Sequence, residues 1–313
     1  MGELSIEIAG LRTGILTRNP EIAEVVRERY KGFLSTGAPG WRIEMKVGAA
    51  PGLSFADDVV VKPDGGPARF LVTRGDLAGT VDLGRRRGTV SFTRANEFSV
   101  DTFLRIVYSL ALVEAHGLVI HAASLIRNSK AYLFCGPSGS GKTTIARLSQ
   151  DATLLSDELS IVRMSDKRAR CHGTPFWGDL ARAGEDRAAS LAAIYFLHHG
   201  SRHTLDAVKP RQALERILPN VLFFAREADL TARVLGVAAD LVEAVPCFDL
   251  SFRLDPGFWE VSDGKTPVSA IVARICEEFD VEPGEARRDA TAFIEKLCQR
   301  GLLTVSETPQ DGS

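Results

Sequence analysis

The chain of 313 residues lacks the features of a membrane, secreted or nucleic-acid-binding protein. Its formal net charge of −2 gives no general attraction to nucleic acid or to anionic lipid. No uninterrupted apolar run approaches the roughly 18 residues that a membrane-spanning helix needs, and the start has neither the basic nor the apolar region of a signal peptide. The sequence therefore predicts a soluble, cytoplasmic protein without a nucleic-acid or membrane partner.

Cysteine is also scarce, and its spacing excludes two kinds of site. The chain has five cysteines and no C-x-x-C pair, so neither a disulfide framework nor a zinc site is indicated. We expect buried, reduced thiols at these positions. His198, His199 and His203 lack a supporting carboxylate or cysteine spacing, and a polar loop is a better interpretation than a metal site.

The first part of the chain, residues 1–98, is predicted to be a β-rich lobe with one helix. Short apolar runs alternate with glycine-containing turns, and Pro20 opens a helical pattern that continues to Leu34. The arginines at 85–87 stand between two glycines, which favours a solvated hairpin tip over a phosphate-binding patch. The expected strands are 4–8, 41–47, 58–61, 70–73 and 89–93.

The pattern changes at Ser99, where we expect a second domain over 99–254. Apolar residues at helical spacing predict a buried helix from Val100 to Val113, with Gly117 at its end. Strands are expected at 118–125, 131–135 and 152–156, with extended chain at 159–164. Helical patterns return over 255–306 around Thr266-Pro267 and Phe293, as in a small helical or winged-helix module, and 307–313 is a polar tail. The fold class is therefore α/β in the broad sense, a mixed α+β protein.

A glycine-rich motif between a predicted strand and a predicted helix is the strongest functional signal. It fits the phosphate-binding pattern G-x-x-x-x-G-K-[ST], in which backbone N–H groups and a helix N-terminus face phosphate oxygens. Lys142 is expected to reach the β- and γ-phosphates, and Thr143 to hold Mg²⁺. The residues expected to bind the nucleotide are Gly136, Pro137, Ser138, Gly139, Ser140, Gly141, Lys142, Thr143 and Thr144.

An acidic pair and a histidine flank this motif. Asp157 follows the apolar strand after the loop, where a nucleotide-binding protein of this type places the acid that serves the metal, although a turn cap is the alternative. Glu158 is its neighbour, and adjacent residues on an extended chain face opposite ways. His121 lies inside an apolar strand, where a single histidine is more often a core residue than a functional one.

The segment from His121 through Gly136–Thr143 to Asp157-Glu158 resembles the HPr kinase family, over roughly residues 99–250. The resemblance implies an HPr-kinase-like core in which a histidine, the phosphate loop and an acidic pair form the active site. It implies transfer of the γ-phosphoryl group of ATP, with Mg²⁺, to a serine or threonine hydroxyl. His121, Lys142, Asp157 and Glu158 are then the catalytic candidates, with Thr143 and Asp157 at the metal.

Two departures from that family change the reaction and the acceptor that we expect. The loop reads Gly-Pro-Ser-Gly-Ser-Gly-Lys-Thr rather than Gly-Asp-Ser-Gly-x-Gly-Lys-Ser, and no counterpart of the glycine-rich signature that supports phosphorolysis is present. The reverse reaction is not predicted, and the acceptor is expected to differ from HPr. The segment Gly173–Asp179 looks like the equivalent of that signature in divergent HPr-kinase-like proteins. Asp179 is a second acid near the phosphates or a turn cap.

The C-terminal segment, from Phe258 to Leu303, resembles the helical half of the PqqD family of peptide-recognition modules. That resemblance implies binding of the leader peptide of a ribosomally made precursor, while a plain packing role for these helices remains an alternative. We therefore predict a kinase that acts on a peptide or small protein. The alternatives are a nucleotide-sensing, peptide-binding protein without turnover and a kinase of a small-molecule hydroxyl. A homo-oligomer is compatible with the sequence.

Overall fold

The computed structural model describes residues 2–48, 58–66 and 68–262, together with 282, 284, 285, 287, 288 and 290–292. The chain divides into two compact units, Met1–Pro256 and Gly257–Ser313. The first unit contains both the predicted β-rich lobe and the predicted nucleotide-binding core, and the boundary proposed after residue 98 falls in the first turn of a helix. In the second unit α6 (Phe258–Ser262) is described. The helices predicted around Thr266-Pro267 and Phe293, and the tail 307–313, lie outside the described residues.

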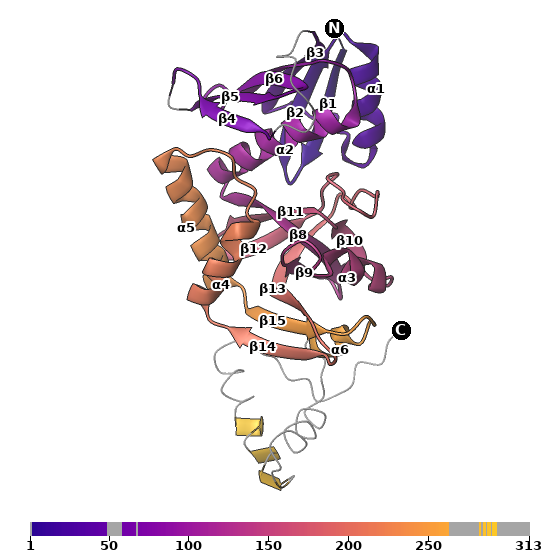
Figure 1. The fold of residues 1–313 in the computed structure, drawn as a ribbon, viewed down its shortest axis with the longest axis vertical. Coiled ribbons are helices and arrows are strands. Elements are labelled where there is room, and N and C mark those ends of the chain that lie inside the picture. The colour runs from indigo at the N-terminus through magenta and orange to yellow at the C-terminus, as the bar shows by residue number, and fades with distance from the viewer. Residues whose placement is uncertain are drawn as a thin grey trace. The chain divides into compact units, whose positions relative to one another are not determined.

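A mixed sheet forms the N-terminal part (Figure 1). It has seven strands in the order β1-β2-β3-β7-β6-β5-β4. The β2–β3 and β3–β7 pairings are parallel and the others are antiparallel. Its strands are β1 (Gly2–Ile8), β2 (Leu11–Thr17), β3 (Trp41–Val47), β4 (Val60–Pro63), β5 (Arg69–Arg74), β6 (Leu77–Asp82) and β7 (Arg87–Phe92).

Two helices are associated with this sheet, and local sequence fixes where each begins. In α1 (Pro20–Arg29) the Asn19 side chain accepts a hydrogen bond from the N–H of Ile22, and in α2 (Glu97–Glu114) Asn96 does the same for Ser99. The helix predicted to reach Leu34 is shorter than expected, because α1 ends at Arg29 and a 3₁₀ turn, η1 (Lys31–Phe33), follows. The predicted glycine end of α2 is also wrong, because Ala115 is its C-cap.

The second sheet contains eight strands. The pairings β8–β11, β11–β12, β12–β13, β13–β9 and β9–β8 close a ring, and β13 continues beyond it to pair with β15. Its strands are β8 (Gly117–Arg127), β9 (Lys130–Cys135), β10 (Thr153–Ser156), β11 (Leu159–Ser165), β12 (Arg168–His172), β13 (Ala188–His199), β14 (Thr204–Val208) and β15 (Cys247–Phe252).

Tight turns join several strands of the two sheets. Asn128 and Ser129 between β8 and β9, and Asp166 and Lys167 between β11 and β12, all have positive φ. Two successive residues with positive φ are typical of the two-residue turns whose twist matches that of antiparallel strands. Arg85 and Arg86 lie in the β6–β7 connection and Arg87 is the first residue of β7, as the hairpin prediction requires.

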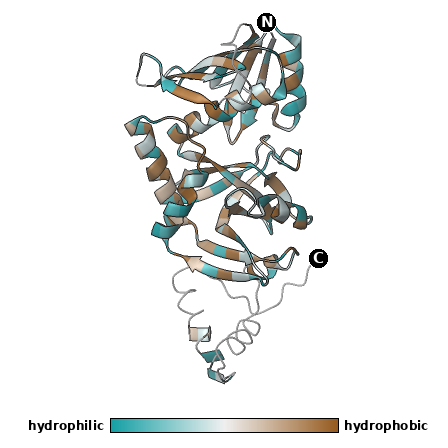
Figure 2. Ribbon diagram, in the orientation of Figure 1, coloured by the Kyte–Doolittle hydropathy of each residue, from teal (hydrophilic) through white to brown (hydrophobic). Residues whose placement is uncertain are grey.

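Helices pack on these sheets around a largely aliphatic and aromatic core. The remaining helices of the first unit are α3 (Lys142–Leu148), α4 (Pro210–Ile217), η2 (Leu218–Asn220) and α5 (Ala228–Ala244). α2 packs against β7 of the first sheet and β8 of the second, so it lies between them (Figure 1). Hydrophobic residues predominate on β8 and β9, whereas α4 is mostly hydrophilic (Figure 2). Cys135, Cys171 and Cys247 are buried free thiols, as predicted for the cysteines in this part of the chain.

Two further findings concern membrane-spanning helices and metal ligands. No helix among the described residues is both long and apolar enough to cross a membrane. Within the same residues, no group of three or more histidine, cysteine, aspartate or glutamate side chains is placed to hold a metal ion. Three histidines near the end of β13 contact other groups: His198 contacts Asp249, His199 contacts the Gly139 carbonyl, and His203 contacts Asp255.

Candidate functional site

The glycine-rich motif lies between a strand and a helix. β9 ends at Cys135, the loop occupies 136–141, and α3 begins at Lys142. Gly139 and Gly141 have φ values of 80° and 100°, a region that side chains other than hydrogen rarely tolerate. A Cβ atom at Gly136 would stand 2.5 Å from the Ser140 hydroxyl oxygen. Glycine is therefore needed at three points of the loop, and the loop leads directly into a helix N-terminus, where anions are favoured.

Lys142 is folded over its own loop. Its ammonium group donates hydrogen bonds to the carbonyl oxygens of Gly136 at 2.8 Å and Pro137 at 3.1 Å. The side chain is buried, and burial lowers the pKa of Lys142 although the nearby charge of Glu158 raises it. Ser140 is also buried, and its hydroxyl has no hydrogen-bond partner among the residues that the structure describes. Pro137, Ser138 and Gly139 are exposed at the crest of the loop, and Thr143 and Thr144 are half-buried in the first turn of α3.

Glu158 and His121 form a pair beside the loop. The His121 Nε2 atom lies 3.5 Å from the Glu158 Oε2 atom, and each side chain is about one third exposed, at 38% and 33%. The pairing of β8 with β11, in which His121 stands opposite Leu159, holds the two together. The hydrogen bond from His121 lowers the pKa of Glu158 most, and the charges of Arg105 and Lys142 lower it further, against the opposing effect of burial. The lone histidine of the strand is therefore not a satisfied core residue.

Asp157 has a different environment. It is 1% exposed, and its two carboxylate oxygens accept hydrogen bonds from the backbone N–H groups of Gly178 at 3.0 Å and Leu180 at 2.9 Å. Asp157 therefore anchors the turn that carries Asp179, which is itself exposed. The structure brings Lys142, Glu158 and His121 together, whereas the carboxylate of Asp157 binds the 178–180 backbone.

A buried ion cluster holds the neighbouring segment 176–178 in place. Asp101 on α2 accepts hydrogen bonds from Arg29 at 2.5 and 3.1 Å, from the Tyr30 hydroxyl at 2.5 Å and from Arg105 at 3.3 Å. The guanidinium carbon of Arg29 lies 3.0 Å from the centre of the Trp177 ring, and Arg105 donates to the Trp177 carbonyl at 3.2 Å. We call Asp101, Arg29, Tyr30 and Arg105 the Asp101 cluster.

Sequence reasoning missed two residues at the site. Arg105, whose charge acts on Glu158, is a charged residue within a largely apolar helical pattern, and such an interruption is the signal that could have identified it. His199 was interpreted as part of a polar loop, but it ends β13, and its Nε2 atom is 2.8 Å from the Gly139 carbonyl oxygen. A Cβ atom at Gly141 would stand 2.6 Å from the Phe252 ring, so β15 also closes on the loop.

These observations define a mixed α+β protein in which a glycine-rich strand–loop–helix segment lies beside a histidine–glutamate pair. A family model, described as SynChlorMet cassette protein ScmC, matches residues 92–264. That match covers more than half of the chain, so the chain belongs to this family. The matched range contains the loop, His121, the acidic pair and the segment 176–180, so the candidate site lies within the part that defines the family.

The C-terminal part matches a second model. Residues 257–303 match the family described as coenzyme PQQ synthesis protein D, PqqD, which agrees with the resemblance inferred for this segment. The match begins at the division between the two compact units, so the PqqD-like segment coincides with the second unit. No curated protein matches the chain.

Proposed function

We propose that the protein is a kinase that uses ATP and Mg²⁺ to phosphorylate a serine or threonine hydroxyl of a peptide or small protein, as HPr-kinase-like enzymes do. The observation that carries the proposal is the pairing of Glu158 with His121 beside Lys142 and the glycine-rich loop. A phosphate-binding loop alone holds a nucleotide. A carboxylate within reach of the phosphates supplies what the transfer also requires, a group that takes the proton of the acceptor hydroxyl.

In this proposal the backbone N–H groups of residues 136–144 hold the phosphates, and Lys142 exchanges its bonds to the loop carbonyls for the β- and γ-phosphate oxygens. The acceptor oxygen forms a bond to the γ-phosphorus, the bond to the bridging oxygen breaks, and ADP leaves with that electron pair. The acceptor proton passes to Glu158. Its lowered pKa keeps it ionised, and a loose transition state makes little demand on base strength.

The roles of the two acids follow from their surroundings. Glu158 is partly exposed and pairs with His121 within the described residues, so it is placed to meet an acceptor. Asp157 is buried and its oxygens already accept two N–H groups, so we assign it to positioning the 178–180 turn. Mg²⁺ prefers oxygen ligands and commonly takes few from the protein, and the Thr143 hydroxyl with the nucleotide phosphates would supply such a set. His121 is a positioning residue that orients Glu158.

The proposal of a peptide acceptor rests on the second unit. Its match to the PqqD family supports a peptide partner, because the resemblance implies recognition of leader peptides. A ribosomally made precursor peptide is then the substrate class that is compatible with both the proposed kinase site and the PqqD-like segment.

The experiment is a transfer assay with γ-labelled ATP, Mg²⁺ and small peptides encoded beside the gene. We expect Lys142→Ala to reduce transfer by about a hundredfold or more, because it removes a charge that acts on the transferring phosphoryl group. Lys130→Ala is the matched control, since Lys130 is an exposed lysine at the other end of β9. Transfer that survives Lys142→Ala would exclude this site as the kinase centre.

A second experiment distinguishes the role of Glu158 from that of Asp157. Glu158→Gln should reduce turnover while leaving nucleotide affinity nearly unchanged, and Asp157→Asn should mainly reduce stability because it weakens two buried hydrogen bonds. If Asp157→Asn instead removes turnover in a protein of unchanged stability, the assignment of the acids is wrong.

One observation favours a second function, a nucleotide-sensing, peptide-binding protein without turnover. The carboxylate in the position of the metal-side acid, Asp157, is used by the backbone of residues 178 and 180. ATP binding without transfer to any peptide or small hydroxyl compound, with peptide affinity that changes when ATP is added, would support this alternative.

A further inference from the structure

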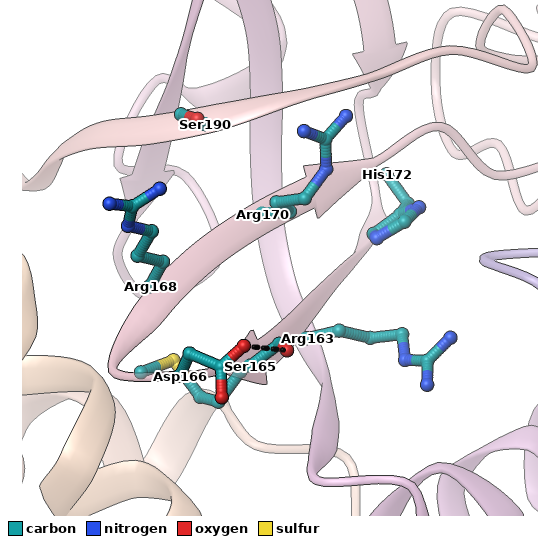
Figure 3. A pocket seen from close by; sticks show the side chains of 8 residues that line it. Arg163, Ser165, Asp166, Arg168, Arg170, His172 and Ser190 are labelled. Carbon is teal, nitrogen blue, oxygen red and sulfur yellow. Dashed lines mark hydrogen bonds between the residues drawn. The ribbon is translucent and has the colours of Figure 1, made fainter.

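The β11–β12 hairpin carries a cavity of about 690 Å³ that the candidate site does not use (Figure 3). Its position on the chain separates it from the loop. Glu158 directly precedes β11, and Arg163, which lines the cavity, is five residues further along, or roughly 16 Å in an extended strand. The polar side chains that line it and carry the argument are Arg163, Ser165, Arg168, Arg170, His172 and Ser190.

Strand register places these side chains on one face of the sheet. Arg163 of β11 stands directly opposite Arg170 of β12, and Ser165 stands opposite Arg168. Arg170 in turn stands opposite Ser190 of β13. Residues that face one another across an antiparallel pair lie on the same side, as do residues two apart on a strand. Three arginines therefore share one face.

The charge on this face is not balanced within the part of the chain that the structure describes. None of the three arginines has a carboxylate oxygen within ion-pair distance there; Arg163 donates to the Ala9 carbonyl at 2.9 Å and Arg170 to the Ala188 carbonyl at 3.1 Å. Asp166 also lines the cavity and accepts a 3.4 Å hydrogen bond from Ser165 (Figure 3). Like charges placed opposite each other destabilise a strand pair, so the fold alone gives no reason for this arrangement.

His172 adds a polar group without adding charge. Burial lowers its pKa to about 4, and the charges of Arg163 and Arg170 lower it too. Its imidazole is therefore neutral near neutral pH and has one nitrogen that donates and one that accepts. The positive charge of the cavity comes from the arginines.

We propose that this cavity binds a phosphate-bearing small molecule. Guanidinium groups match phosphate oxygens in geometry, and each can donate two parallel hydrogen bonds. The Cα atoms of directly opposite residues are about 4.5–5.5 Å apart, so the side chains of Arg163 and Arg170 can meet a single phosphoryl group. A phosphoryl group carries nearly two charges on one centre, whereas acidic residues on one face of an extended peptide are about 7 Å apart. The higher charge density of a phosphoryl group favours a phosphate ligand over an acidic peptide.

The test is a calorimetric titration of the full chain with inorganic phosphate. Every protein in it carries Lys142→Ala, so that the lysine of the glycine-rich loop contributes nothing and the result does not depend on the proposed kinase activity. Arg168→Gln and Arg170→Gln are then added together. Both side chains are exposed, whereas Arg163 also contacts the turn between β1 and β2. We expect phosphate to bind before, and at least about tenfold more weakly after, this double substitution.

A matched control removes two positive charges elsewhere. Arg85→Gln with Arg211→Gln alters side chains that are 80% and 92% exposed, and it should leave phosphate affinity within about twofold. The proposal is overturned if the folded Lys142→Ala protein binds no phosphate, if the Arg168 and Arg170 substitutions leave the affinity unchanged, or if the control lowers it equally. Binding of a pentaglutamate peptide without binding of phosphate would also overturn it, in favour of an acidic peptide.

Discussion

Two groups of arginines in this protein differ in what balances their charge. In the Asp101 cluster, Arg29 and Arg105 share one buried carboxylate, and Arg29 also lies over the ring of Trp177. On the β11–β12 face, Arg163, Arg168 and Arg170 line an open cavity and have no carboxylate partner among the described residues. In the first group a buried carboxylate balances the arginine charges, so the arrangement stabilises the fold. In the second group like charges repel one another and lower the stability of the fold. Such a destabilisation is expected where a ligand supplies the missing negative charge.

The largest loss of stability should come from a substitution in the Asp101 cluster. Asp101→Asn leaves Arg29 buried without its counter-charge, and we expect the free energy of unfolding to fall by about 3–5 kcal/mol. Chemical denaturation measures this. Asp64→Asn is the control, because its pair with Arg69 is exposed and should be worth about 1 kcal/mol at most. Equal losses in the two variants would mean that burial does not distinguish the groups.

A smaller effect should follow from removing the partner of Glu158. In His121→Ala the hydrogen bond that lowers the pKa of Glu158 is lost while burial, which raises it, remains, so the pKa rises. A carboxylate with a lowered pKa stabilises the fold above its unfolded pKa, near 4.3, and that contribution is lost as the pH falls through its folded pKa. The stability difference between wild type and variant should therefore be full above about pH 5 and shrink in acid.

Titration of the Glu158 carboxyl by NMR measures that shift directly, and unfolding at several pH values measures its consequence. His198→Ala is the control, because His198 pairs with Asp249 and should leave Glu158 unaffected. A Glu158 pKa that stays the same in His121→Ala would contradict the pairing.

The smallest change in stability is expected from a substitution on the β11–β12 face. Arg168 is exposed and has no ion pair among the described residues, so Arg168→Gln should change the free energy of unfolding by no more than about 0.5 kcal/mol. The change should be towards greater stability at low salt, because a like charge is removed, and it should vanish at about 1 M salt. Thermal unfolding at both salt concentrations checks this. A loss of more than 1 kcal/mol would mean that Arg168 belongs to the fold.

Local patterns in the sequence predicted the parts of the fold that local chemistry determines. The glycine-rich motif identified the junction of β9 and α3, and the strand at 41–47 was placed correctly. β6 was missed because Gly79 interrupts its pattern. A Cβ atom there would stand 2.4 Å from the Thr89 carbonyl and 2.9 Å from the Phe103 ring, so this glycine serves the close approach of α2 to the sheet. Such contacts between distant segments leave no local signal.

The alternation of side chains along a strand could not predict which of Asp157 and Glu158 faces the loop. The pairing of β10 with β8 shifts register between Leu154 and Ser156, so counting along the strand does not tell which acid faces the loop. The segments that anchor the acids are also remote in sequence, since Gly178 and Leu180 bind Asp157 from more than twenty residues away. Sequence identified the acidic pair as a candidate, and the three-dimensional structure separates its members.

Trp177 has an optical consequence. Its ring is stacked under Arg29, and the next residue, Gly178, donates its N–H to Asp157. A rearrangement at the acidic pair therefore changes the surroundings of an indole ring one peptide away. The protein carries its own fluorophore at the candidate site, and excitation of Trp177, with Trp41 and Trp259 replaced by phenylalanine, would report on that site without any attached label.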